Sequence, residues 1–331
     1  RREQRMGAPP APPPCSWKSF LVVGVLFPLH IVAGVLTWPV LLILLVRGST
    51  TALVLLLLYT PLFLFPAQRR MPGWKGAQAL WRWFDYERTC PSYFGTFGLY
   101  GAKQHIDPHQ QYVVASHPHG TVIFQRTYWQ TELLGRFFER RGWRMIGASV
   151  IFRIPIVREL SLLFGAIDAD KAMCEKVLRS GTNLVVFPGG LDEANTLGTT
   201  SGDVRIKTRT GFIRLAIKHG VPVLPTFTFG ELDAVDAVAL LPPAATQWVK
   251  RNLRMSTTFF AGRWGTFIPK RVPFNMCVGA PIPVTKMDPS ETEVFAMQVE
   301  RVHEAYKSEI QRLYEENKRK FGYDDRPLVF I

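Results

Sequence analysis

Cysteine is scarce in this sequence, and the four cysteines lie far apart. Cys15, Cys90, Cys174 and Cys277 form no C-x-x-C pair within the 331 residues. The pattern therefore indicates neither a disulfide framework nor a thiolate zinc site. We expect the folded part of the chain to face the cytosol.

Acidic residues are the second deficit. There are 26 Asp and Glu against 40 Lys and Arg, for a net charge of +14. Most of the excess lies in residues 66–285, which hold 27 basic and 15 acidic side chains. Such a surplus suits nucleic acid, anionic lipid or a phosphorylated ligand. No zinc-finger, RRM-like or basic-zipper pattern is present, so we expect no nucleic-acid partner.

Charge of either sign is nearly absent from residues 20–65, where Arg47 is the single charged side chain. Residues 20–46 are long enough to cross a bilayer, since a helix needs about 20 apolar residues to do so. The second apolar run, residues 52–65, reaches only about 21 Å as a helix. Either the second run borrows flanking residues, or both runs form a hairpin that enters the membrane and returns. A kinked or re-entrant path fits three prolines: Pro28, Pro39 and Pro61.

The charges around these runs favour a hairpin with both ends in the cytosol, because seven cations flank it and only Arg47 lies between its arms. A cleaved signal peptide is the competing interpretation, but its apolar region of 7 to 15 residues is far exceeded. The expected organisation is a disordered Pro-rich cytosolic tail over residues 1–19, a membrane-embedded hairpin over 20–65 and one domain over 66–331.

Strand and helix patterns alternate through this domain. Strands are expected over residues 111–116, 144–149, 182–187 and 221–229, and helices over 122–141, 171–180 and 210–219. Their succession predicts an α/β fold with a mainly parallel sheet covered by helices. A C-terminal amphipathic helix is predicted by the spacing of Val294, Met297, Val302, Tyr306, Ile310 and Leu313. This helix packs on the sheet or, as an alternative, lies on a membrane surface.

Two histidines follow the first predicted strand in the motif His117-Pro-His119-Gly120. Reactive groups gather at the carboxyl ends of parallel strands, and imidazole is the commonest general base near neutral pH. From the residues alone, a general base, a metal ligand and a structural turn all stay open. No further His, Asp or Glu cluster with ligand spacing lies nearby.

Another motif, Phe187-Pro-Gly189-Gly190, follows the third predicted strand and is succeeded by Asp192 and Glu193. Paired glycines allow close approach of a ligand or backbone, and either carboxylate is able to orient a histidine, as in a catalytic triad. Taken alone, the motif is a turn with solvated or helix-capping acids. A third candidate site is a run of cations that is either a phosphate site or a solvated basic face: Arg205, Lys207, Arg209, Arg214 and Lys218.

Together these blocks resemble the type-2 acyl-CoA:diacylglycerol acyltransferase family, which includes monoacylglycerol and wax-alcohol acyltransferases. The resemblance covers roughly residues 66–331. It is carried, in the right order, by Ser116-His-Pro-His-Gly120, residues 147–155 with 165–168, Phe187-Pro-Gly-Gly190 with Glu193, Arg209-Thr-Gly-Phe-Ile-Arg-Leu-Ala216, residues 221–225 and Phe229-Gly-Glu231.

The resemblance implies an acyl-CoA-dependent O-acyltransferase with a glycerophosphate-acyltransferase-like sheet. We expect it to esterify diacylglycerol to triacylglycerol, with a monoacylglycerol or long-chain alcohol as the alternative acceptor. His119 is the expected general base, with His117 holding the turn or exchanging roles with it, and Glu193 orients a histidine. Gly189, Gly190 and the cations receive coenzyme A. No metal and no cofactor beyond the acyl-CoA co-substrate are expected.

The same resemblance implies an endoplasmic reticulum membrane protein in contact with membrane lipid, with lipid-droplet targeting and a homo-oligomer left open. A non-catalytic hairpin anchor for membranes or lipid droplets is the alternative from another class. Glycerophosphate acyltransferases are distant relatives in motif order, but they carry an arginine where this chain has residues 191–193. Asp192 and Glu193 at that place are expected to repel a phosphorylated acceptor, which favours a neutral one.

Overall fold

The computed structural model describes residues 14–64, 67–69, 75–190, 192–193, 202–239, 241–253, 258–290 and 292–331. The α-helices are α1 (Trp17–Ser19), α2 (Phe27–Val46), α3 (Thr50–Leu64), α4 (Lys75–Trp83), α5 (Tyr86–Phe94), α6 (Ala102–His105), α7 (Glu132–Gly135), α8 (Val157–Leu163), α9 (Lys171–Arg179), α11 (Gly211–His219), α12 (Pro243–Leu253) and α13 (Thr292–Asn317). The strands are β1 (Phe97–Tyr100), β2 (Val113–His117), β3 (Trp143–Gly147), β4 (Ala166–Asp168), β5 (Asn183–Val186), β6 (Val204–Ile206), β7 (Val223–Phe229), β8 (Asp236–Ala239), β9 (Thr258–Ala261), β10 (Phe274–Val278) and β11 (Leu328–Phe330).

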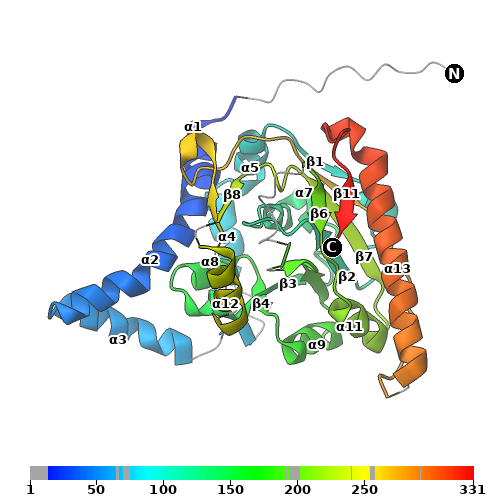
Figure 1. Ribbon diagram of the computed structural model, residues 1–331, viewed down its shortest axis with the longest axis horizontal. Coiled ribbons are helices and arrows are strands. Elements are labelled where there is room, and N and C mark those ends of the chain that lie inside the picture. The colour runs from blue at the N-terminus through cyan, green and yellow to red at the C-terminus, as the bar shows by residue number, and fades with distance from the viewer. Residues whose placement is uncertain are drawn as a thin grey trace.

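A seven-stranded sheet forms the centre of the domain, in the order β1-β10-β7-β2-β5-β3-β4 (Figure 1). The pairs β7/β2, β2/β5, β5/β3 and β3/β4 are parallel, and β10 is antiparallel to β7. Every residue of β2, β5 and β7 is buried, as expected of parallel strands with both faces covered. The expected α/β class, with a mainly parallel sheet and flanking helices, is confirmed.

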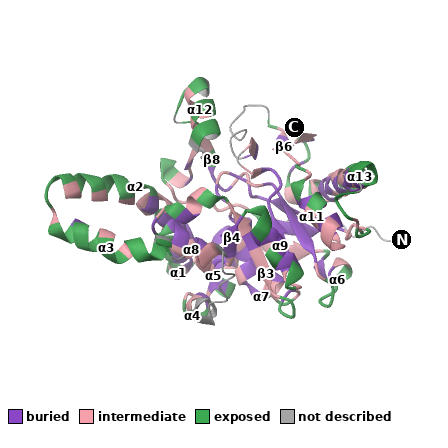
Figure 2. Cartoon of the chain, turned by 90° about the horizontal axis from the view of Figure 1, so that it is seen from below, coloured by how far each residue is buried: buried purple, intermediate pink, exposed green. Residues whose placement is uncertain are grey.

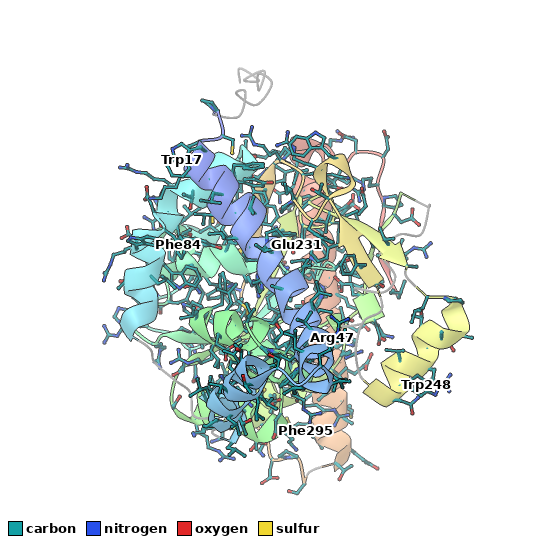
Figure 3. All side chains as sticks on the ribbon, turned by 90° about the vertical axis from the view of Figure 1, so that its left-hand side faces the viewer. Trp17, Arg47, Phe84, Glu231, Trp248 and Phe295 are labelled. Atoms are coloured by element: carbon teal, nitrogen blue, oxygen red, sulfur yellow. The ribbon has the colours of Figure 1, made fainter. Side chains whose placement is uncertain are left out.

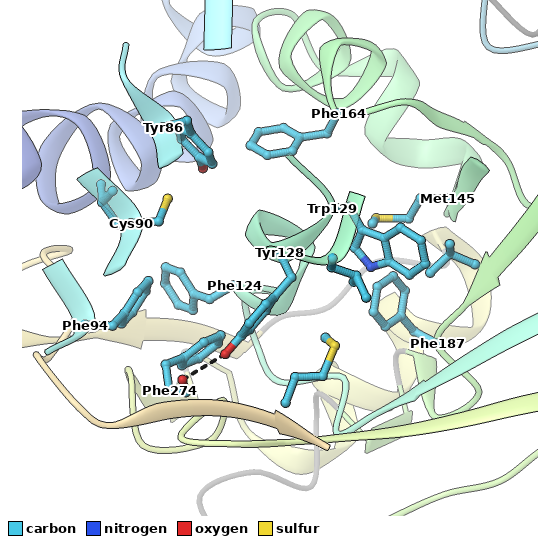
Figure 4. Packing of buried hydrophobic residues seen from close by; sticks show 14 of the residues in the cluster. Tyr86, Cys90, Phe94, Phe124, Tyr128, Trp129, Met145, Phe164, Phe187 and Phe274 are labelled. Carbon is cyan, nitrogen blue, oxygen red and sulfur yellow. Dashed lines mark hydrogen bonds between the residues drawn. The ribbon is translucent and has the colours of Figure 1, made fainter. Parts of the chain in front are cut away.

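Two hydrophobic clusters cover the two faces of this sheet. One joins the aromatic rings of Phe94, Phe124, Tyr128 and Phe274 and extends to Phe187 at the end of β5 (Figure 4). The Tyr128 hydroxyl donates to the Phe274 carbonyl over 2.8 Å, which satisfies its buried polar atom. The other cluster contains the apolar faces of α9, α11 and α13.

The structure differs from the predicted helix boundaries at two places. Residues 122–141 do not form one helix but a 3-10 segment, Gln125–Gln130, followed by α7. Thr127, Tyr128 and Trp129 are buried in succession, and three consecutive residues span about 200° of an α-helix, more than one buried face accommodates. On α13, Val294 and Met297 are exposed, because the buried stripe begins at Phe295 and continues through Val299, Val302, Tyr306, Ile310 and Leu313.

The helices α2 and α3 form a hairpin that projects from the domain (Figures 1 and 2). Residues 17–46 make one apolar helix of 30 residues, long enough to cross a membrane, whereas the second arm is shorter. The outer surface of the whole hairpin is apolar and exposed, at Leu42, Leu57 and Leu58 among other residues. This apolar helix indicates membrane association. Of the disordered tail predicted for residues 1–19, residues 1–13 lie outside the described residues, whereas Trp17–Ser19 form α1 and are ordered.

The base of the hairpin is tied to the segment around α8. The Trp38 indole donates to the carbonyl of Arg153 over 2.9 Å, and Arg158 donates to the carbonyl of Leu62 over 2.7 Å. Gly34 lies so close to the segment before α8 that a Cβ at this position would be 2.6 Å from the Pro155 carbonyl oxygen. The hairpin is therefore packed on the domain at a defined place.

Candidate active site

The sheet order brings three sequence motifs to one edge. β2 lies between β5 and β7 and is parallel to both, so the carboxyl ends of the three strands are neighbours. His117 ends β2, Phe187 follows β5, and Glu231 follows β7 after a single glycine. The turn of residues 117–120, which we call the histidine turn, therefore lies between the loops that carry Glu193 and Glu231.

Glu193 holds the histidine turn from one side. Its side chain is fully buried, and Oε2 lies 3.2 Å from Nδ1 of His117. The carboxylate also accepts hydrogen bonds from the backbone N–H of His119 and, over 3.2 Å, from the backbone N–H of Lys207. Glu193 therefore joins two loops to the turn, in addition to facing His117 as expected of an orienting carboxylate.

Gly189 makes room for this carboxylate. A Cβ at residue 189 would lie 1.8 Å from Oε2 of Glu193 and 2.6 Å from its Cβ, distances that no pair of atoms adopts without displacement. The glycine pair was expected to bind the co-substrate. The geometry gives Gly189 a different task, which is to let Glu193 reach the histidine turn.

His119 presents its imidazole on the accessible side of the turn. Its ring is half-buried and stands edge to face against Phe187, with the ring centroids 6.0 Å apart. Nδ1 lies 2.7 Å from the carbonyl oxygen of Gly120. Because a carbonyl only accepts, Nδ1 carries the proton and donates it, which leaves the lone pair on Nε2.

Burial lowers the pKa of His119 below its ordinary value of 6.5; the Gly120 carbonyl and Glu193 oppose the shift, and His117 and Arg209 add to it. The imidazole is therefore neutral near pH 7, as a general base must be. Residues 119–124 are not helical, so burial and not a helix N-terminus keeps this imidazole neutral.

His117 has a different environment. Its side chain is fully enclosed, and its ring centroid lies 6.0 Å from that of Tyr306 on α13. An acceptor hydroxyl has no path to a ring that is 0% exposed. The structure thus separates the two histidines into an internal one, His117, and an accessible one, His119.

A second buried network, which the sequence analysis missed, braces the turn from the opposite side. The carboxylate of Glu231 accepts from the backbone N–H groups of Phe124 and Gln125 over 2.6 and 2.7 Å. A Cβ on Gly120, whose φ is +68°, would lie 3.1 Å from Oε1 of Glu231. Burial raises the pKa of Glu231 well above its usual range, and the two N–H donors oppose this shift. Figure 3 labels Glu231 in the interior of the domain.

Gln125 completes this network. Its amide donates to the carbonyl of Pro118, between the two histidines, and its oxygen accepts from Ser116 over 2.5 Å and from Thr228 over 3.0 Å. One sequence feature could have indicated Glu231: it follows the strand β7 much as Glu193 follows β5. Nothing local in the sequence marks Gln125.

A cavity of about 490 Å³ opens beside the histidine turn. Phe187 and Pro188 line it, as do apolar residues of α11 and α13 such as Phe212 and Phe295. Four cations surround it: Lys171, Arg209, Arg214 and Lys218. Phe187, which lines the cavity, also contacts His119, so a single ring separates the cavity from the accessible histidine.

Comparison with known proteins identifies the family. The sequence model of the diacylglycerol acyltransferase family matches residues 45–331. This chain belongs to the diacylglycerol acyltransferase family. It is therefore an acyltransferase of lipid biosynthesis, which excludes the alternative of a non-catalytic anchor.

Members of this family that resemble the chain carry three kinds of name. Acyl-CoA wax alcohol acyltransferase 2 from Homo sapiens is 28% identical, covering 76% of this chain and 80% of the relative. Diacylglycerol O-acyltransferase 2 from Xenopus tropicalis is 26% identical, with 79% and 74% covered. 2-acylglycerol O-acyltransferase 1 from Bos taurus is 27% identical, with 90% and 94% covered. Among solved structures, the 1-acyl-sn-glycerophosphate acyltransferase PlsC from Thermotoga maritima gives a TM-score of 0.43 at 16% identity, covering 78% of this chain and 97% of the other.

The cations expected to bind coenzyme A in this acyltransferase divide into two groups. Arg209 and Arg214 line the cavity, whereas Arg205 and Lys207 are not among its lining residues. Arg205 lies on β6, 3.4 Å from Asp203, and Lys207 lies 3.2 Å from Asp192. Two lysines also line the cavity. Lys171 lies well before this run in the sequence, and Lys218 is its last member.

The expected repulsion of a phosphorylated acceptor by Asp192 and Glu193 is wrong as an electrostatic argument. Asp192 is paired with Arg209 at 2.5 Å and with Lys207 at 3.2 Å, and Glu193 is fully buried. Neither carboxylate presents an uncompensated charge to the cavity. The choice of acceptor must therefore rest on other grounds.

Proposed function

We propose that this acyltransferase transfers the acyl group of acyl-CoA to the free hydroxyl of diacylglycerol, giving triacylglycerol. The carrying observation is the position of the histidine turn between a basic cavity and the membrane hairpin. On one side, Phe187 links His119 to the cavity. On the other, Phe124, four residues beyond the turn, contacts Phe27 of the hairpin, with ring centroids 5.3 Å apart.

The cavity suits coenzyme A because, like that molecule, it combines charged and apolar groups. Its cations favour phosphate groups, and its apolar walls favour the pantetheine arm and adenine. The hairpin keeps the domain at the membrane that contains diacylglycerol and acyl chains. We propose the endoplasmic reticulum membrane, with the domain and both hairpin ends in the cytosol.

In the proposed reaction, Nε2 of His119 accepts the proton of the acceptor hydroxyl as its oxygen attacks the thioester carbonyl. The tetrahedral intermediate then collapses, the carbon–sulfur bond breaks, and the imidazolium returns the proton to the leaving thiolate. The products are an ester and free coenzyme A, so neither a metal nor a resident cofactor is needed. Glu193, Glu231 and Gln125 position the turn that carries the base.

The test is acyl transfer by purified membranes with one labelled acyl-CoA and equal amounts of diacylglycerol, monoacylglycerol, a long-chain alcohol and lysophosphatidate. We expect diacylglycerol to be acylated faster than each of the other three acceptors. Loss of the base should reduce turnover about 10²- to 10⁴-fold in His119→Ala, with membrane insertion retained. Faster acylation of lysophosphatidate would overturn the acceptor assignment, and wild-type turnover of His119→Ala would overturn the mechanism.

A further inference from the structure

The helix α12 has an apolar face without a partner in the described part of the chain. It lies in an insertion between β7 and β10 of the main sheet, where it connects the two antiparallel strands β8 and β9. None of the side chains described on α12 is buried, and Trp248 is 61% exposed. Isolated helices of this length are marginal in water and need a packed face for stability.

The pattern of α12 is amphipathic. Ala244, Ala245, Trp248 and Val249 have the spacing of one helical face, which is bordered by Arg251 and interrupted by Asn252, and Gln247 lies on the other face. Residues 243–253 contain two basic residues and no acidic one. An exposed tryptophan on the less polar face of a basic helix is typical of helices that lie in a membrane interface.

The place of α12 in the fold fits the same surface. The hairpin projects to one side of the domain, and α12 lies near its base with its axis across that direction (Figures 1 and 2). In Figure 3, which faces the side where the hairpin projects, Arg47 at the hairpin turn lies between Phe84 beside α4 and Trp248 on α12. Trp83 at the end of α4 is 71% exposed, so exposed tryptophans flank the hairpin on both sides.

We propose that α12 is a membrane-surface helix, which inserts the Trp248 face into the headgroup region of the phospholipid bilayer that holds the hairpin. The inference rests on the proposed insertion of the hairpin, because the lipid surface at the hairpin base is continuous with the surface that α12 meets. Two separated contacts, the hairpin and α12, would fix the orientation of the domain relative to the bilayer. The partner is therefore lipid and not a second protein chain.

Site-specific fluorescence on the full chain, reconstituted in phosphatidylcholine vesicles with and without phosphatidylserine, tests this proposal. A polarity-sensitive probe is attached to Trp248→Cys, to the matched control Gln247→Cys on the polar face, and to Leu55→Cys in the hairpin, each with Cys15→Ser. The other cysteines are buried. Spin-labelled lipid should quench the probes at residues 248 and 55 strongly and the probe at residue 247 several-fold less.

The outcomes separate the two claims. Quenching at residue 55 without quenching at residue 248 overturns the surface helix while the hairpin assignment stands, and quenching at neither removes both. Shielding of the probe at residue 248 that depends on protein concentration and not on lipid would identify a second copy as the partner and reject the proposal. Greater quenching at residue 248 with phosphatidylserine would indicate that the cations contact anionic headgroups.

An activity measurement gives independent support. Trp248→Glu should lower acylation of vesicle-borne diacylglycerol about fivefold, the equivalent of ~1 kcal/mol of lost surface binding, and leave acylation of a short-chain soluble acceptor unchanged. The control Gln247→Glu should alter neither rate. Equal rates of Trp248→Glu and wild type on vesicles, or an equal loss on both acceptors, would contradict the proposal.

Discussion

Replacing Gly189 by alanine tests the arrangement of the site more directly than removal of a catalytic group. The new Cβ would lie 1.8 Å from Oε2 and 2.5 Å from Cδ of Glu193, so the carboxylate or the loop has to move. Glu193 then loses its contacts with His117 and with the backbone N–H groups of His119 and Lys207. Breaking a buried charged network of this kind costs about 3–5 kcal/mol.

For a domain of this size, such a loss lowers the apparent Tm by roughly 6–12 °C. We also expect Gly189→Ala to reduce kcat/KM about 100-fold, because the histidine turn is displaced by an ångström or more. The assays are thermal unfolding in detergent and acyl transfer from labelled acyl-CoA. Gly135→Ala is the control, since the nearest atom to a Cβ there is 3.7 Å away and the residue ends α7.

A double variant identifies the cause of the loss. Glu193→Gly removes the three nearest atoms that the new Cβ would meet, so adding Gly189→Ala to it should lower the Tm little further. Additive losses in the double variant, or a wild-type Tm and kcat/KM in Gly189→Ala alone, would refute the steric reasoning.

Further predictions concern the pH profile, the cavity and the topology. A general base acts in its unprotonated form, so activity is lost as the pH falls through the lowered pKa of His119. The midpoint of the acidic limb of the kcat/KM profile should therefore lie below pH 6.5. A midpoint above pH 6.5 would exclude His119 as the base. Arg214→Ala should raise the KM for acyl-CoA about tenfold, which corresponds to a loss of ~1.4 kcal/mol in binding free energy, and leave the KM for diacylglycerol unchanged. Arg319→Ala, which removes the same charge at an exposed position, is the control. An effect on the KM for the acceptor would contradict the assignment. Tags at residues 10 and 331 should show equal protease sensitivity in sealed microsomes, since both are expected on the cytosolic side; opposite protection would mean an odd number of crossings.

The parts of this fold that sequence predicts are those set by local patterns. Apolar runs predict β2, β5 and β7, and a turn after a strand predicts the places of His119 and Glu193. The partners of these residues depend on strand order, which periodicity does not encode. Glu193 therefore could be expected to face a histidine, while its bonds to the backbone of His119 and Lys207 could not.

Gln125 and Asp192 illustrate the same limit. Gln125 reaches Pro118, Ser116 and Thr228 because β2 and β7 are adjacent, a fact of the tertiary fold. Asp192 appears in the sequence as an acid in a turn, and only the fold shows that Lys207 and Arg209 compensate its charge. Net charge near a site therefore predicts less than the pairing of each charge.

The short strand β11 pairs in parallel with β6, and β6 leads into the loop whose Lys207 N–H binds Glu193. Just before β11, the Tyr323 hydroxyl accepts from the backbone N–H of Gly230, beside Glu231. Both loops that hold the histidine turn are thus secured by residues 323–331. In synthesis from the N-terminus, the hairpin helices α2 and α3 emerge before residues 323–331. The loops around the histidine turn therefore gain these supports only after the hairpin has been synthesised, so the candidate active site is completed late in the synthesis of the domain.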